Sequence, residues 1–140
     1  MTDLLHRIKV FLYRQANPAP EYLLLKPFHG MEALWGPLQS ELGFGEKLEP
    51  AIRHHVRADL GLVAPGQLID LKAPSIWTLG DEDVIEWNYG YECTDRLDRD
   101  LISRNWSDYR WEDFTVAYPA LGLEFDRQAI LRLHSNLSAA

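Results

Sequence analysis

Two ionisable side chains, His55 and Asp59, interrupt the apolar stripe of a segment that has the period of a helix. Segment 47–60 carries an apolar residue at every fourth position and is followed by a glycine, which predicts an amphipathic α-helix. The apolar positions are Leu48, Ile52, Val56 and Leu60. His55 and Asp59 are one turn apart, so both project from this face. Polar groups avoid such a face unless they have partners, which makes the pair a candidate for chemistry.

These two residue types are consistent with two roles. A histidine and a carboxylate at this spacing can satisfy each other by a hydrogen bond at the edge of the core, which is a structural role. They can also share one metal ion, because both lie on the same side of the helix. A lone pair of this kind is a weak metal motif, so the spacing by itself favours the structural role.

The elements around this helix follow from hydrophobic patterning and turn residues. Strands are expected at 6–14, 22–25, 67–71, 75–79 and 84–93, and a closing helix is expected to be N-capped at Phe125-Asp126. Segment 26–46 is rich in glycine and predicts an irregular loop around a short extended piece, whereas 94–108 is a polar stretch. This order predicts an α/β (α+β) protein with a mixed sheet sandwiched between helices.

Composition restricts the class of protein. With 140 residues, 46% hydrophobic and 25% charged, the chain is expected to form one domain over 1–140. The single cysteine, Cys93, argues against a disulfide framework and favours a reducing, cytoplasmic location. No apolar run approaches the roughly 18 residues of a membrane span, so no membrane association is expected. The net charge of −7 argues against a nucleic-acid polymer as partner and favours a small ligand.

The predicted helix and the loop before it resemble the box of the Nudix hydrolase superfamily. That box reads Gly, five residues, Glu, seven residues, then Arg-Glu-aliphatic-x-Glu-Glu-x-Gly-aliphatic. The positions that match in spacing and type are Glu46, Val56, Gly61 and Leu62. The positions that depart are Ser40 for the first glycine, His54 for the arginine, His55 and Ala58 for two glutamates, and Asp59 for the last glutamate. The resemblance implies the Nudix fold.

Outside the box, the chain is most similar to the branch of the superfamily that acts on diadenosine tetraphosphate and dihydroneopterin triphosphate. Segment 23–26 looks like the strand that ends in a basic residue near the substrate, and 107–114 resembles the segment before the closing helix. That branch has a further glutamate six residues before the tryptophan. Asn105 occupies this position here.

In this family, box glutamates hold divalent cations that neutralise a diphosphate and orient the attacking water. Asp59 is the only carboxylate left at these metal-binding positions, so we expect weak or absent magnesium-dependent pyrophosphohydrolase activity. The predicted ligands are His55, Asp59 and the backbone carbonyl of Gln39. The expected ion is magnesium or manganese, with zinc or nickel as the less favoured alternative. No organic cofactor is expected.

The resemblance also proposes roles for residues outside the helix. Glu46, Asp59 and Asp108 are the candidate catalytic carboxylates, with Asp108 replacing the glutamate that is missing at Asn105. Glu46 is also expected to pair with His54 and brace the loop. The candidate substrate-binding residues are Lys26 for phosphate and Phe28, Trp35, Trp87 and Tyr89 for a base. Core packing on the sheet is the alternative role for each aromatic residue.

Three functions remain open at this point. The first is a phosphoanhydride hydrolase with altered metal ligands, and the second is a non-catalytic module that binds or senses a small nucleotide. The third is a fold reused for protein contacts alone, since a fold does not determine a function. An open cleft beside His55 and Asp59, with Lys26 at its edge, would favour the first two.

Overall fold

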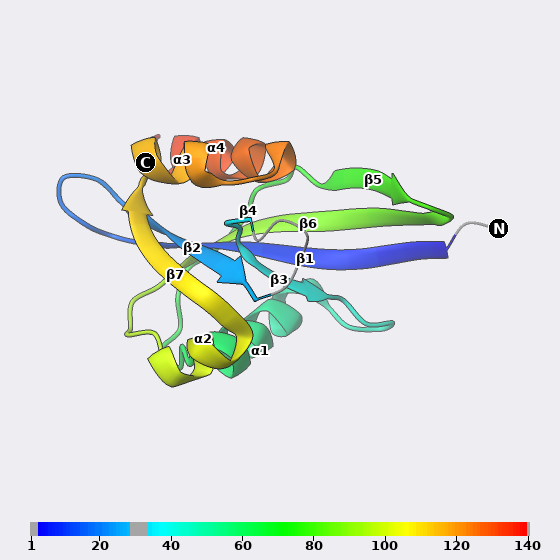
Figure 1. The fold of residues 1–140 in the computed structure, drawn as a ribbon, viewed down its shortest axis with the longest axis horizontal. Helices are drawn as coiled ribbons and strands as arrows, with labels where there is room; N and C mark the ends of the chain where they lie inside the picture. Colours follow the sequence, from blue (N-terminus) through cyan, green and yellow to red (C-terminus); the bar gives the residue numbers. More distant parts are fainter. Residues whose placement is uncertain (1–2, 29–33, 140) are drawn as a thin grey trace.

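A mixed sheet of seven strands lies between two layers of helices in the computed structural model, which describes residues 3–28 and 34–139 (Figure 1). The strands are β1 (Asp3–Arg14), β2 (Glu21–Pro27), β3 (Leu38–Glu41), β4 (Leu68–Asp70), β5 (Ser75–Leu79), β6 (Glu82–Glu92) and β7 (Trp106–Asp113). The helices are α1 (Leu48–Leu60), α2 (Arg99–Asn105), α3 (Phe114–Ala120) and α4 (Glu124–Ser138). Helices α1 and α2 cover one face, and α3 and α4 cover the other, which confirms the predicted sandwich. Within the described ranges, no helix is long and apolar enough to cross a membrane.

Strand β1 organises the sheet because three strands pair with it. Along one edge it runs parallel to β6, from the pair Asp3–Glu82 to the pair Tyr13–Glu92. Its other edge is divided: β3 pairs antiparallel with residues 7–10, and β2 pairs antiparallel with residues 13–14. The sheet therefore splits between β2 and β3, and the split is bridged by Leu25 and Gly36.

Both faces of the sheet are buried, and each has its own hydrophobic cluster. The side chains of β1 alternate between them, as the period of a strand requires. Ile8, Val10 and Leu12 pack with the buried residues of α1. Phe11 and Tyr13 pack with α3 and α4. This burial on both sides explains why segment 10–13 is a continuous apolar run.

Helix α1 forms where the apolar period predicts it, one residue shorter at its start. Ala51, Ile52, Val56 and Leu60 are its buried residues. Gly61 ends the helix with φ of 75°, in the left-handed region that favours glycine. A Cβ at Gly61 would also lie 2.5 Å from the Cβ of Asp98, so the glycine is needed for close packing of the following chain.

The polar stretch at 94–108, where the hydrophobic pattern predicts no element, contains α2 and the first residues of β7. Ile102 is the only buried residue of α2, and the helix begins on an Asp98 cap whose side chain accepts from the N–H groups of Asp100 and Leu101. Strand β7 lies at the edge of the sheet, and its residues are exposed or half-buried. Neither element therefore has the hydrophobic period on which sequence prediction depends.

The start of the closing helix also differs from the prediction. Helix α4 begins at Glu124, after Leu123, which makes no side-chain cap bond. Asp126 is therefore inside the first turn, and it is buried rather than exposed as a cap. Its carboxylate binds a lysine on the sheet instead of the helix N-terminus.

Candidate functional site

His55 connects α1 to β3 through one ring nitrogen, and its other ring nitrogen contacts Asp59 on the same helix. Its Nε2 lies 2.8 Å from Oγ of Ser40, and its Nδ1 lies 3.3 Å from Oδ2 of Asp59. The His55 and Asp59 side chains are 23% and 31% exposed. An ionised Asp59 can only accept, so Nδ1 carries the proton in the neutral ring and Nε2 accepts from the Ser40 hydroxyl. The predicted His55–Asp59 hydrogen bond is therefore present.

The Ser40–His55 contact links two positions at which the chain departs from the Nudix box. Ser40 stands where the box has glycine, and His55 stands where it has glutamate. A glycine offers no side-chain partner for the imidazole, whereas the serine hydroxyl satisfies it at 2.8 Å. The two departures are thus complementary, and together they form a hydrogen-bonded chain from Ser40 through His55 to Asp59.

The donor set at this position does not fit magnesium. Magnesium prefers six oxygen ligands in octahedral geometry. Position 55 offers nitrogens that already have partners, position 58 offers an exposed methyl group, and Asp59 offers the remaining carboxylate. In the described part of the chain, no three His, Cys, Asp or Glu side chains are grouped closely enough to hold a metal. Gln39 precedes Ser40 on β3, so the side chains of these two residues point to opposite faces of the sheet.

The other candidate carboxylates lie away from this hydrogen-bonded chain. Oε1 of Glu46 accepts from the backbone N–H of Gly43 at 2.7 Å and closes the turn that leads into α1. His54 is exposed and meets His55 edge-on, with ring centroids 5.2 Å apart. Across the residues that the structure describes, no hydrogen bond joins Glu46 to His54. Asp108 is on β7, where it accepts from the N–H of Tyr109.

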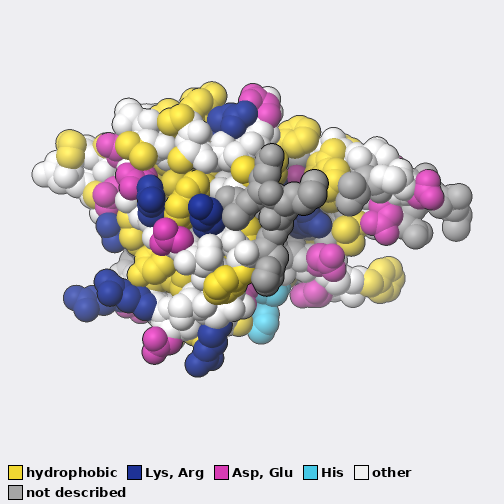
Figure 2. Space-filling model, viewed as in Figure 1, with side chains coloured by type: hydrophobic (Ala, Val, Ile, Leu, Met, Phe, Trp, Pro, Cys, Tyr) yellow, Lys and Arg dark blue, Asp and Glu magenta, His cyan; other side chains and the backbone are white. Residues whose placement is uncertain are grey.

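Lys26, Trp35 and Arg110 form a cation–aromatic group, called here the Trp35 cluster. Nζ of Lys26 lies 5.5 Å from the centroid of the Trp35 ring, and the Arg110 guanidinium lies 5.0 Å from it. Asp108 is opposite Lys26 in the pairing of β2 with β7, so its carboxylate is on the same side. Figure 2 shows basic and acidic side chains around hydrophobic ones on the part of this face where β2 and β7 lie. The group carries two positive charges beside one negative charge.

A recess of about 300 Å³ opens at the split between β2 and β3, and none of the three residues of the Trp35 cluster lines it. It is lined by Leu25, Pro27, Leu34, Gly36, Pro37, Gln39 and Trp106. In the sequence, Lys26 stands between the lining residues Leu25 and Pro27, and Trp35 stands between Leu34 and Gly36. His55 and Asp59 are not part of the lining. Phe28 follows β2 and is 50% exposed, and residues 29–33 of the same loop lie outside the described part of the chain.

Trp87 and Tyr89 lie on β6 and pack in the cluster beneath α1. The Trp87 indole donates to Nδ1 of His6 at 3.2 Å and stacks on that ring. Tyr89 is 9% exposed, and burial raises the pKa of its hydroxyl. The structure gives these two rings core contacts, and it does not place them in the lining of the recess.

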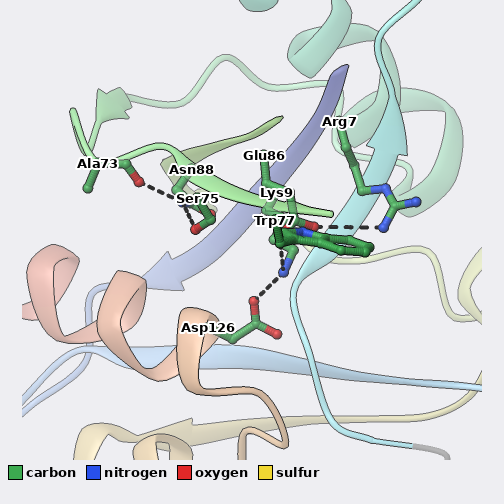
Figure 3. Close-up of polar contacts among 8 residues, drawn as sticks. All are labelled: Arg7, Lys9, Ala73, Ser75, Trp77, Glu86, Asn88 and Asp126. Atoms are coloured by element: carbon green, nitrogen blue, oxygen red, sulfur yellow. Dashed lines mark hydrogen bonds and ion pairs between the residues drawn. The ribbon is translucent and has the colours of Figure 1, made fainter. Parts of the chain in front are cut away.

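Sequence reasoning missed a buried charged network between β1, β6 and α4 (Figure 3). Nζ of Lys9 lies 2.6 Å from Oδ1 of Asp126 and 3.2 Å from Oε1 of Glu86. The same Glu86 oxygen accepts from the Trp77 indole at 2.9 Å, and Arg7 lies 3.7 Å from its other oxygen. Burial raises the pKa of the Asp126 carboxyl, while Lys9 partly opposes this effect. One signal was available: an ionisable Lys9 inside the strand predicted at 6–14 requires a partner.

Comparison of the whole fold places this arrangement of sheet and helices among the Nudix hydrolases. The Ap4A hydrolase of C. elegans superposes with a TM-score of 0.75 at 14% identity, over 97% of this chain and 99% of that one. The E. coli dihydroneopterin triphosphate pyrophosphohydrolase gives 0.75 at 18% identity, over 94% and 95%. The Nudix domain of NrtR from Shewanella oneidensis, solved with ADP ribose, gives 0.74 at 17% identity, over 98% and 90%.

These similarities establish the Nudix fold, as the resemblance of the box predicted. No protein-family model matches the sequence. No curated protein matches it either. At identities of 14–18%, the comparison defines the fold, and the activity has to be argued from the residues of this chain.

Proposed function

We propose that this protein binds a small nucleoside-diphosphate-linked ligand and has weak or absent magnesium-dependent pyrophosphohydrolase activity. The observation that carries the proposal is the Trp35 cluster, in which two cations gather on one aromatic ring. Arginine guanidinium and lysine ammonium groups bind phosphate oxygens by charge-assisted hydrogen bonds. The lining of the recess, with its proline, leucine and Trp106 side chains, suits the apolar face of a base or ribose.

Similar structures bind or act on ligands of this chemical class. The NrtR domain was solved with ADP ribose, and two further neighbours are named for Ap4A and for dihydroneopterin triphosphate. All three ligands contain linked phosphates. A diphosphate fits the Trp35 cluster because its adjacent negative charges can reach Lys26 and Arg110 at the same time.

Weak hydrolysis is expected from the Ser40–His55–Asp59 chain. Loss of about 3 to 4 kcal/mol of transition-state stabilisation lowers a rate by a factor of roughly 100 to 1,000. The box positions of this protein lack more than one carboxylate, and the remaining Asp59 is hydrogen-bonded to His55. Glu46, Asp59 and Asp108 remain the proposed catalytic carboxylates of any residual activity. If hydrolysis is absent altogether, the proposed function is that of a non-catalytic nucleotide sensor.

For the proposed ligands His55 and Asp59, an ion softer than magnesium is the better match. These side chains face each other at 3.3 Å, and nitrogen ligands suit manganese, nickel or zinc better than magnesium. The backbone carbonyl of Gln39 is the proposed third ligand. Such an ion has to displace the Ser40 hydroxyl or the Asp59 contact from the imidazole, which lowers its affinity.

We also propose that the protein works in the cytoplasm as a single domain over residues 1–140. The thiol of Cys93 is 8% exposed, and it donates to the backbone carbonyl of Asp95. Burial raises the pKa of this thiol, so it stays protonated and unreactive. A buried structural thiol of this kind suits a reducing compartment.

The test combines binding and turnover in one set of ligands. ADP ribose and Ap4A are titrated calorimetrically into the protein with EDTA, with magnesium and with manganese, and hydrolysis is followed by chromatography. We expect binding in EDTA that Lys26→Gln and Arg110→Gln each weaken about tenfold, since each removes one charge-assisted contact. The matched control is Arg57→Gln, which removes an exposed charge from the outer side of α1.

Three results would contradict the proposal. Turnover of about 1 per second or more with magnesium would show that other groups hold the metal. Absence of binding to both ligands, or equal weakening by Arg57→Gln and Arg110→Gln, would remove the Trp35 cluster as a ligand site.

A further inference from the structure

A second recess, of about 820 Å³, lies between the end of β1, the loop before α2 and β7. Its lining includes Arg14, Asp95, Arg96, Arg99, Tyr109 and Trp111, and it is called here the arginine recess. A smaller recess shares Arg14, Asp95 and Arg96 with it. Three guanidinium groups therefore surround one concave surface that also has two aromatic rings.

The positive charge of the arginine recess contrasts with the rest of the chain. The protein has a net charge of −7 and 14 lysine and arginine residues, three of which meet here. The side chains of Arg96 and Arg99 are exposed, and in the described part of the chain neither forms an ion pair. Figure 2 shows Lys and Arg side chains gathered at the edge of the molecule, beside the loop before α2.

The lining of the recess has an excess of positive charge, because three arginines are accompanied by one carboxylate, Asp95. Two further carboxylates lie around it: Glu21 binds Arg14 at 2.7 Å, and Asp98 accepts from two backbone N–H groups at the start of α2. Arg96 and Arg99 line the recess without an ion pair in the described part of the chain, and they are the groups that an anionic ligand can neutralise.

The floor of the recess is held by packing. The Arg14 guanidinium lies 4.4 Å from the centroid of the Trp111 ring and is also bound by Glu21, so its position is set from two sides. Tyr109 and Trp111 are half-buried and pack against the hydrophobic cluster under α1. Groups held in this way lose little conformational entropy when a ligand binds.

The arginine recess is separate from the site of the proposed function. Side chains alternate along β7, so Tyr109 and Trp111 face this recess, whereas Arg110 faces Trp35 on the other side of the strand. The arginine recess is also distant from Ser40 and His55. Ser40 pairs with Ile8 on β1, and Arg14 is six residues further along the same strand, which is about 20 Å at the rise of a strand. The two recesses have no lining residue in common.

We propose that the arginine recess is a second binding site, for a small molecule that carries a phosphate or diphosphate group. Guanidinium forks match the oxygens of a phosphate in two-point contacts, and three of them can surround a diphosphate. Tyr109 gives the site an aromatic edge against which the organic part of the ligand can pack. The proposal does not depend on the function of the Trp35 cluster.

The test uses inorganic pyrophosphate and ADP as probes, with EDTA present so that no divalent cation contributes. Binding to the full-length protein is measured by calorimetry and by NMR shifts of the Trp111 indole and of the amides of Arg96 and Arg99. We expect Arg96→Gln combined with Arg99→Gln to weaken pyrophosphate binding at least tenfold. The matched control is Arg104→Gln, on the same helix but outside the lining, with an expected change below about twofold.

Comparing ADP with pyrophosphate shows whether the organic part of the ligand contributes to binding. If the two affinities are equal, the site recognises only the phosphate groups. If ADP binds more tightly, the site also contacts the nucleoside part. In both cases Trp35→Ala leaves the Trp111 shift unchanged. The proposal is overturned if Arg104→Gln weakens binding as much as the double variant, or if neither probe shifts the Trp111 indole. Melting temperatures of the variants exclude unfolding as the cause.

Discussion

Lys9 and Asp126 lie 117 positions apart in the sequence, and their side chains meet at 2.6 Å in the interior of the protein. Both are 1% exposed. Lys9 comes from the middle of β1, and Asp126 comes from the first turn of α4, so this contact sets the position of the helix on the sheet (Figure 3). Glu86 on β6 is the second partner of the ammonium group. Buried charges are tolerated only when they are paired in this way.

We predict that Lys9→Met lowers the free energy of unfolding by about 3 to 5 kcal/mol, because it leaves Asp126 and Glu86 buried without their cation. Combining Lys9→Met with Asp126→Leu should cost less than the sum of the two single changes. Urea unfolding of the four proteins measures this, with Lys47→Met as the control at an exposed lysine. Simple additivity would show that the two charges do not interact.

The stability contributed by Asp126 should fall as pH rises. Burial raises the pKa of this carboxyl above its ordinary value of 3.8. Between that value and the higher folded pKa, the native state therefore binds more protons than the unfolded state, and stability decreases with pH until both states are ionised. The free energies of unfolding of wild type and Asp126→Asn are compared from about pH 4 to about pH 8. The predicted sign is contradicted if the free energy of unfolding of the wild type, minus that of Asp126→Asn, increases with pH.

A double-mutant cycle on Ser40→Ala and His55→Ala should give a coupling of about 0.5 to 1.5 kcal/mol, as expected for one partly buried hydrogen bond. His54→Ala is the matched control, because this neighbouring histidine is exposed and the hydrogen bond of Ser40 goes to His55. Chemical unfolding measures all the variants. Equal coupling of Ser40 to both histidines would mean that the hydroxyl does not recognise the His55 ring.

Restoring two box carboxylates should create a magnesium site. His55→Glu with Ala58→Glu places three carboxylates, with Asp59, within one turn of α1, whereas each single change leaves too few hard oxygens. Without metal, the three anions repel one another and lower the melting temperature, and magnesium should reverse this loss. Thermal melting of the wild type, both singles and the double, with and without magnesium, tests this. A magnesium-dependent shift in the double no larger than in the wild type would show that the box alignment is wrong.

The sequence was informative where one element shows its own periodic pattern. Helix α1 and the predicted strands were found within a few residues of their true ends, because a buried face imposes a period on the residues themselves. The same pattern placed His55 and Asp59 on one side of the helix, where their hydrogen bond is observed. Edge strand β7 and short helix α2 bury too little to leave such a pattern.

By itself, the sequence predicted the fold through the spacing of its box and placed α1 through its apolar period. Only the tertiary structure decided which side chains from different elements contact one another. Ser40 reaches His55 from another element, Arg110 joins Lys26 on Trp35, and Lys9 meets Asp126 across the core. The physical reason is that these contacts join residues from separate elements, and only the packing of the sheet against its helices brings their side chains within bonding distance.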